Sequence, residues 1–215
     1  MRESGSEKVI PPNPEFAKLA SDEQILRTIQ ALEANNITTY LAEHGREARK
    51  KVLELLPPGA EVFTATSKTL ESIGVADDVN NSGHYVSLLS KIAKLDRKTQ
   101  SNQIRLIAST PDYVIGSVHA VTENGEVLIA SASGSQLALY SSGAGTLVWV
   151  VGTQKIVKDL DEGFRRIKEY TFPLEDARMQ EAHKLRSAVN KILIVNREGK
   201  QGRTTLIFVK EKLGF

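Results

Sequence analysis

The sequence contains no cysteine among its 215 residues. This absence excludes disulfide bonds, and it excludes thiolate ligation of zinc or of an iron–sulfur cluster by the chain itself. The histidines show no metal-ligand spacing, so no metal site is predicted. The P-loop and G-x-G-x-x-G patterns are missing, and no flavin or nicotinamide fingerprint is present. We therefore expect no cofactor bound by this chain.

The sequence also has little net charge and no long apolar run. Its formal net charge is +2, and no stripe of Lys and Arg interleaved with aromatic residues predicts nucleic-acid binding. No apolar stretch approaches the roughly 20 residues of a membrane helix, and the N-terminus lacks the apolar region of a signal peptide. We expect a cytoplasmic protein that has no nucleic-acid partner and no membrane association.

Periodicity along the chain predicts one α/β domain. Residues 1–15 contain three prolines and are expected to form a flexible arm, with a single domain over residues 16–215. From Ser21, which begins a capping-box signature, helical and strand patterns alternate and predict an open, mainly parallel, Rossmann-like sheet flanked by helices. The run Thr146–Gly152 is the most continuously apolar and predicts a central strand buried on both faces.

The second half of the chain adds a hairpin and two helices to this prediction. Asn124-Gly125 predicts a two-residue type I′ turn between two short strands. One helix is expected to open at Asp159, and another is expected to begin at Pro173, a position where a helix tolerates proline. Two strands are expected near the end, over residues 191–196 and 204–210, in or beside the main sheet.

The stretch Ser131–Gln136 lies between a predicted strand and a predicted helix and is unusually rich in small residues. Gly134 allows the backbone to approach a ligand, and the amides that open the helix favour a phosphate or carboxylate. Ser133, Ser135 and Gln136 add side-chain donors. The alternative is that a serine here only caps the helix.

Two more polar junctions follow predicted strands. Ser67, Lys68 and Thr69 begin a helix after one strand, and Gln154 and Lys155 follow the apolar strand that ends at residue 152. Ligands of parallel sheets bind beyond the carboxyl ends of the strands, so these junctions are expected to converge on one crevice. Both lysines are candidate contacts to an anion, and capping by Ser67 is the alternative.

His119 follows another predicted strand, and Glu123 lies four residues further on. A histidine beside a carboxylate could act as a general acid or base. The alternatives are a structural histidine and a solvated carboxylate at the shoulder of the turn.

Several segments together resemble the lactate-utilisation (LUD) domain family, of the lactate-utilisation protein C type, over residues 22–215. They are TSKTLESIG, SVHAVTENGEVLIASASGSQLALY, VWVVGTQKIVKDLDEGFRRIKEY, PLEDAR and VNKILIVNRE with GRTTLIFVKEKLGF. The resemblance implies an isomerase- and CoA-transferase-like fold. It also implies a ligand site that includes Gly116, His119, Gly134 and the three polar junctions.

The sequence departs from the pattern of these relatives in three ways. Some family members carry a C-terminal cysteine cluster near the place where this chain has EAHKLRSAVN, and this chain has no cysteine to form it. The acidic position of the sugar-phosphate isomerases is His119 here, so their proton transfer does not carry over. The G-T-G-N-R turn of many LUD proteins is replaced by Ser133–Gln136, which removes an arginine.

The resemblance implies a non-redox component of a system that oxidises L-lactate to pyruvate with iron–sulfur partner subunits. The crevice predicts a small anionic metabolite as ligand. The alternative is an autonomous enzyme or binder that acts on a sugar phosphate, nucleotide or CoA ester.

Overall fold

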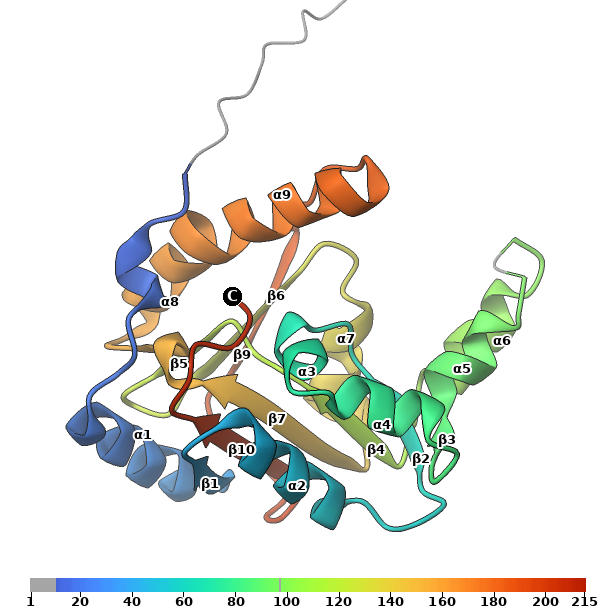
Figure 1. Cartoon of the computed structure of the whole chain (residues 1–215), viewed down its shortest axis with the longest axis horizontal. Helices are drawn as coiled ribbons and strands as arrows, with labels where there is room; N and C mark the ends of the chain where they lie inside the picture. Colours follow the sequence, from blue (N-terminus) through green and yellow to red (C-terminus); the bar gives the residue numbers. More distant parts are fainter. Residues whose placement is uncertain (1–10, 97) are drawn as a thin grey trace, which may run out of the picture.

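The computed structural model describes residues 11–96 and 98–215. A six-stranded sheet lies at its centre, with helices on both faces (Figure 1). The strand order is β1-β10-β7-β4-β2-β3, and every neighbouring pair is parallel. The strands are β1 (Thr38–Ala42), β2 (Glu61–Thr64), β3 (Val86–Ser87), β4 (Tyr113–Gly116), β7 (Thr146–Gly152) and β10 (Thr204–Val209). The predicted α/β class with a Rossmann-like parallel sheet is confirmed.

Strand β7 lies in the interior of the sheet, between β10 and β4, as its apolar run predicts. Its side chains alternate between two cores. Trp149 packs with Ile25 of the first helix, whereas Val150 packs with Val52 and Leu70 on the opposite face. Both faces of the strand are therefore removed from water, which is why no polar side chain occurs between Leu147 and Val151.

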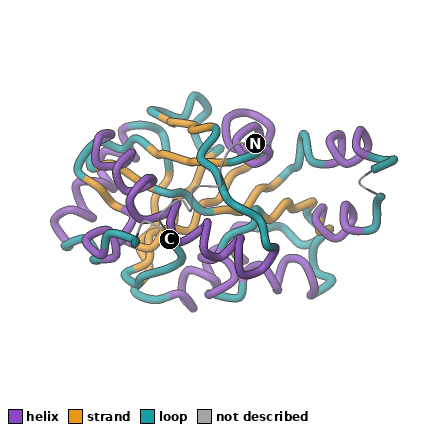
Figure 2. Tube along the Cα trace, turned by 90° about the horizontal axis from the view of Figure 1, so that it is seen from above, coloured by secondary structure: helices purple, strands orange, loops and turns teal. Residues whose placement is uncertain are grey.

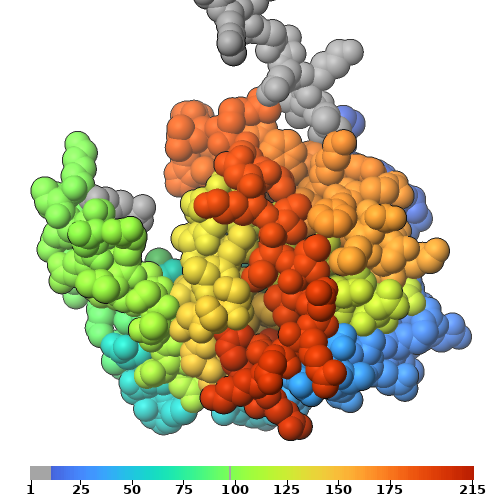
Figure 3. All heavy atoms as spheres, turned by 180° about the vertical axis from the view of Figure 1, so that it is seen from behind, coloured from blue at the N-terminus to red at the C-terminus, as the bar shows by residue number. Residues whose placement is uncertain are grey.

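Helices surround the sheet, and one pair projects from it. The helices are α1 (Asp22–Ala34), α2 (Gly45–Leu55), α3 (Lys68–Ser72), α4 (Val75–Asn81), α5 (Leu88–Ala93), α6 (Ser101–Ile107), α7 (Ser135–Ala138), α8 (Leu160–Arg166) and α9 (Phe172–His183). The predicted capping box opens α1, with Ser21 and Gln24 bonded reciprocally. Helices α5 and α6 stand away from the body in Figure 2 and Figure 3. Within the described ranges, no helix is long and apolar enough to cross a membrane.

A second, four-stranded sheet has the order β8-β5-β6-β9. Its strands are β5 (Ala120–Thr122), β6 (Val127–Ser131), β8 (Ile156–Val157) and β9 (Lys191–Val195). The hairpin β5–β6 is antiparallel as predicted, but its turn is not type I′, because that type needs a positive φ at both central residues and Asn124 has none. Gly125 alone is left-handed, with φ 85°, and its N–H donates to the carbonyl of Thr122. This arrangement fits the longer hairpin loop that ends in a glycine bulge.

The two helices predicted after residue 159 form one continuous run in the structure. A π-helical segment, Ile167–Thr171, joins α8 to α9, so Pro173 lies inside the run. Proline has no N–H, and the carbonyl of Glu169, four residues earlier, therefore loses its helical donor. The backbone N–H of Asn13 takes that place at 2.8 Å.

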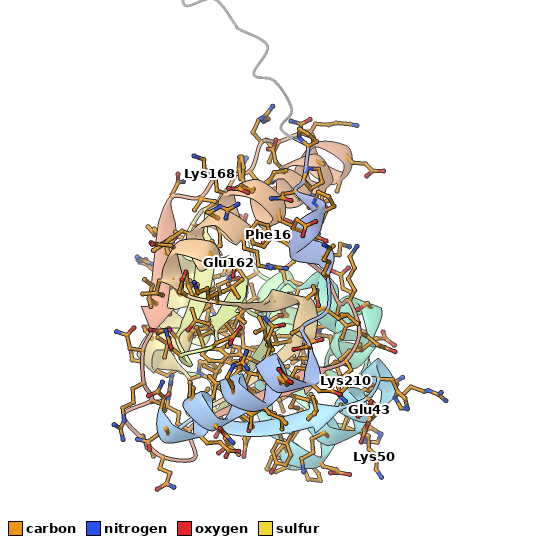
Figure 4. All side chains as sticks on the ribbon, turned by 90° about the vertical axis from the view of Figure 1, so that its left-hand side faces the viewer. Phe16, Glu43, Lys50, Glu162, Lys168 and Lys210 are labelled. Carbon is orange, nitrogen blue, oxygen red and sulfur yellow. The ribbon has the colours of Figure 1, made fainter. Side chains whose placement is uncertain are left out.

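This contact holds the described end of the predicted arm against the helix run. The 3₁₀ helix Pro14–Ala17 follows Asn13, and Phe16 is buried in a cluster with Ile167 and Tyr170 of the helix run. Figure 4 shows Phe16 beside this run. Residues 1–10 of the predicted arm lie outside the described residues.

Candidate functional site

A cavity of about 590 Å³ lies where β2, β4 and β7 end. The polar residues after these strands line one side of it: the start of α3, Ser117–His119, and Lys155 in the 3₁₀ helix Thr153–Lys155. The helix run of α8 and α9 and the segment after it line the other side. The volume is typical of small-molecule sites, which span about 300–1,000 Å³. The place is also the usual one for a ligand of a parallel sheet.

Lys155 forms part of the cavity wall although its side chain is buried, with 2% of the residue exposed. Its Nζ donates to Ser117 Oγ at 3.1 Å, to the Val118 carbonyl at 3.1 Å and to Thr69 Oγ1 at 3.2 Å. The two hydroxyls donate their own hydrogens to backbone carbonyls. Three acceptors around Nζ match the three N–H bonds of an ammonium group.

Arg166 lies next to Lys155 and is fully buried. Its guanidinium donates to the carbonyls of Gln154 and His119 and to Thr171 Oγ1, while Nη2 has no partner among the described residues. Burial lowers the pKa of Arg166 to about 10. Burial, and then the charge of Arg166, lower the pKa of Lys155 well below its usual value.

No carboxylate within the described ranges pairs with either of these two cations. Two buried like charges repel each other and lose their hydration, so an anion bound nearby would stabilise both. The floor of the cavity is therefore suited to an anionic group.

His119 lines the cavity and is neutral. Its Nδ1 accepts a hydrogen bond from the Ala130 N–H at 3.0 Å, which places the ring proton on Nε2. Burial, followed by the charges of Lys155 and Arg166, lowers the pKa of His119 to about 3. The ring is therefore neutral at pH 7 and carries its hydrogen-bond donor on Nε2.

Glu123 does not line the cavity and does not accompany His119, as the sequence had suggested. Its carboxylate accepts hydrogen bonds from Gln24 Nε2 at 3.0 Å and Arg27 Nε at 2.9 Å, both on α1. The predicted acid–base pair is not assembled, because the turn that carries Glu123 faces α1 instead of the strand ends.

The junction Ser67–Thr69 lies at the cavity, and it also caps a helix. Ser67 Oγ accepts from the Leu70 N–H, which is the capping alternative, while Ser67, Lys68 and Thr69 all line the cavity. Lys68 is at the exposed edge and pairs with Glu71 at 2.5 Å. Thr69 is buried and supports Lys155.

The turn before α7 brings Ser133, Ser135 and Gln136 to the cavity. Gly134 does not line it but is left-handed, with φ 87°, and a Cβ there would lie 2.8 Å from the Lys191 side chain. Lys191 Nζ donates to the Ser133 carbonyl at 2.7 Å. Gly134 therefore shapes the turn that presents the two serines.

Gly116 and Gln154 act behind the cavity. A Cβ on Gly116 would lie 1.7 Å from the Tyr140 hydroxyl oxygen, so only glycine leaves room for Tyr140, which lines the cavity. Gln154 Nε2 donates to the Leu213 carbonyl at 2.9 Å and holds the last described segment of the chain in place. Neither Gly116 nor Gln154 lines the cavity.

The sequence analysis missed Ser117 and the whole helical side of the cavity. Ser117 directly follows β4, so the argument applied to the other strand ends would have found it. Phe172, Arg178 and Met179 carry no local signal, because only their packing decides which face of a helix borders a cavity. Among the described residues, no three or more acidic or histidine side chains are grouped to hold a metal ion.

Comparison with known proteins identifies the family of this chain and a solved structure with a similar fold. The sequence profile described as LUD domain matches residues 25–210. The structure is similar to that of a DUF162 family protein from Deinococcus radiodurans, with a TM-score of 0.55, 12% identity, and coverage of 89% of this chain and 99% of that one. A weaker similarity, to eIF2B beta from Chaetomium thermophilum, has a TM-score of 0.36 at 18% identity and covers 68% of this chain and 45% of that one. No curated protein shows a significant match to the sequence. The similarity to the DUF162 family protein supports the fold.

Proposed function

We propose a function from the premise that this chain belongs to the LUD domain family. Membership fits lactate utilisation at the level of the family. The proposal is that the chain is a non-redox component of a system that converts L-lactate to pyruvate, and that it binds a small anionic metabolite in the cavity. Iron–sulfur partner subunits would carry the electrons, because this chain has no cysteine to ligate a cluster. A cytoplasmic location is part of the same proposal.

The observation that carries this proposal is the pair of buried cations at the cavity. Lys155 and Arg166 have no carboxylate partner among the described residues, and Lys155 lies in the cavity wall. The carboxylate of lactate or pyruvate would supply the missing negative charge. The hydroxyl or carbonyl oxygen of the same ligand could then accept a hydrogen bond from His119.

A second candidate function is an autonomous enzyme or binder that takes a sugar phosphate, nucleotide or CoA ester. The exposed edge of the cavity carries Lys68 and Arg178, each paired with a neighbouring carboxylate, Glu71 or Glu175. A ligand with a second anionic group could compete for these pairs. This arrangement would accept a phosphorylated ligand longer than lactate.

A thermal-shift screen of the whole chain against lactate, pyruvate, sugar phosphates, nucleotides and CoA esters tests both candidates. A ligand present at 100 times its dissociation constant stabilises the fold by about 2.7 kcal/mol. We expect lactate or pyruvate to stabilise the wild type and to lose this effect in Lys155→Met. Lys210→Met is the matched control, since Lys210 pairs with Asp22 and Glu43 away from the cavity (Figure 4).

Three other outcomes decide between the candidates. Stabilisation by phosphorylated compounds alone would favour the second function. Equal stabilisation of Lys155→Met and the wild type would contradict the cation site. If no compound in the panel stabilises the chain, anion binding by the isolated chain is wrong.

A further inference from the structure

The two sides of the cavity differ in chemistry. The side at the strand ends is polar and charged, with Lys155, Thr69 and Ser117 at its centre. The opposite side is mixed: besides Glu175, Arg178 and Arg186, it carries a group of apolar side chains that we call the helix wall, namely Ile167, Phe172, Met179 and Val189. The first three lie on one face of the α8–α9 run, at spacings of five and seven residues, which return to the same side of a helix that contains a π turn.

Much of the helix wall lies outside the hydrophobic clusters of the described residues. Phe172, Met179 and Val189 belong to none of the three hydrophobic clusters formed by the described residues, and Val189 is 39% exposed. Ile167 is buried and connects this wall to the core under the second sheet. Apolar surface at a cavity gains free energy when an apolar group covers it, in proportion to the area removed from water.

A ligand that satisfies both sides needs a negative head and an apolar body. A carboxylate beside Lys155 would use the polar side, and the Nε2–H of His119 would be a donor to an oxygen on the neighbouring carbon. Lactate has only a methyl group to offer to the helix wall. A cavity of about 590 Å³ leaves the rest of that wall uncovered.

We infer that the preferred ligand is a 2-hydroxy or 2-oxo monocarboxylate whose side chain is a branched aliphatic or aromatic group, placed against Phe172, Met179 and Val189. This inference rests on the proposed function, since it requires the carboxylate to bind at Lys155. It adds the class of side chain, which the family does not specify.

The test is a binding series on the whole chain with lactate, 2-hydroxyisocaproate and 3-phenyllactate. Trp149 is the single tryptophan and contacts Tyr140 edge to face at 5.5 Å, so its fluorescence reports on the cavity that Tyr140 lines. Calorimetry gives the dissociation constants independently. We expect affinity to increase about fourfold per buried methylene, the ratio that corresponds to about 0.8 kcal/mol.

Matched variants on the same helix run locate the effect. Phe172→Ala should reduce the affinity for 3-phenyllactate at least tenfold and leave lactate within twofold. Phe164→Ala is the control, because Phe164 is on the same run, 41% exposed and away from the cavity. If Phe172→Ala does not fold, Met179→Gln, which changes a half-buried residue, replaces it.

The outcomes separate the inference from the proposed function. Equal affinity for all three acids would overturn the inference and leave the carboxylate site intact. A rising series that Phe172→Ala and Met179→Gln do not alter would also overturn it, because the side chain would then bind elsewhere. Absence of binding by every acid would overturn both.

Discussion

Two arginines are buried among the residues that the structure describes, and their charges are balanced differently. Arg203, 8% exposed, donates to three backbone carbonyls at the end of the π segment Leu139–Gly143 and to Glu198 at 2.7 Å. Arg166 is fully buried, leaves one nitrogen unpartnered and lies beside Lys155. Each is a buried cation, but only Arg203 is neutralised within the described protein.

The difference distinguishes a structural ion from a binding ion. Arg203 donates to the Tyr140 and Ala144 carbonyls, which have no backbone donor at this helix end, and its carboxylate partner balances its charge. Burial lowers the pKa of Arg166, and burial together with the charge of Arg166 lowers the pKa of Lys155, so keeping both groups protonated costs stability that no counter-charge among the described residues offsets. A buried charge without a counter-charge at a cavity is therefore evidence for a ligand, whereas a buried charge with one is not.

The largest expected effect comes from removing the neutralised arginine. Arg203→Met removes the ion pair with Glu198, which keeps the Thr204 hydroxyl as a donor, and leaves the Tyr140 and Ala144 carbonyls without theirs. We therefore expect a loss of about 3–5 kcal/mol in the free energy of unfolding. Urea denaturation measures it. Arg197→Met, at an exposed arginine, is the control and should change stability by at most about 0.5 kcal/mol. If Arg203→Met lowers the free energy of unfolding by less than about 1 kcal/mol, Arg203 does not have the structural role that distinguishes it from Lys155 and Arg166.

Lys155→Met should have a much smaller effect. Removing an uncompensated buried charge stabilises the fold, and this gain offsets the loss of the bond to the Val118 carbonyl, about 1–3 kcal/mol, so we expect stability to stay nearly unchanged. Urea denaturation without added ligand measures this change. A marked loss of stability would mean that Lys155 is a structural ion like Arg203.

His119 extends the comparison to pH. Its pKa in the folded chain is about 3, against an ordinary value of 6.5, because of burial and then the charges of Lys155 and Arg166. Between pH 3 and pH 6.5 the unfolded chain therefore binds a proton at this histidine that the folded chain does not. The stability that neutral His119 contributes is complete above pH 6.5 and is lost as the pH falls toward 3. His119→Gln should flatten the decline of urea stability between pH 7 and pH 4, while His84→Gln, at an exposed histidine, should leave it unchanged. An unaltered decline in His119→Gln would contradict the assigned neutral state.

The smallest effect is expected at Glu123. Glu123→Gln removes an ion pair with the half-exposed Arg27 at 2.8 Å, which is worth at most about 1 kcal/mol. Anion binding in the thermal-shift screen should not change. Loss of anion binding in Glu123→Gln would mean that Glu123 takes part in the site, although its position on the turn keeps it away from the cavity.

Much of the fold and half of the cavity could be predicted from the sequence. The apolar run of β7 indicated a central strand, and the strand-end argument placed Thr69 and Lys155 in one cavity. The turn at Asn124 was assigned the wrong type, because an Asn-Gly pair is compatible with more than one hairpin loop. The helical side could not be found, because α8 and α9 were predicted as separate helices with no defined orientation.

The sequence by itself determined where strands end and which polar residues follow them, because apolar periodicity and turn residues act within a few positions along the chain. Only the tertiary structure decided that β9 joins a second sheet and that Glu123 faces α1. It also decided that the helix run closes over the cavity, and that no carboxylate within the described residues approaches Lys155. These features depend on contacts between residues far apart in sequence, and packing free energy, not local preference, selects them.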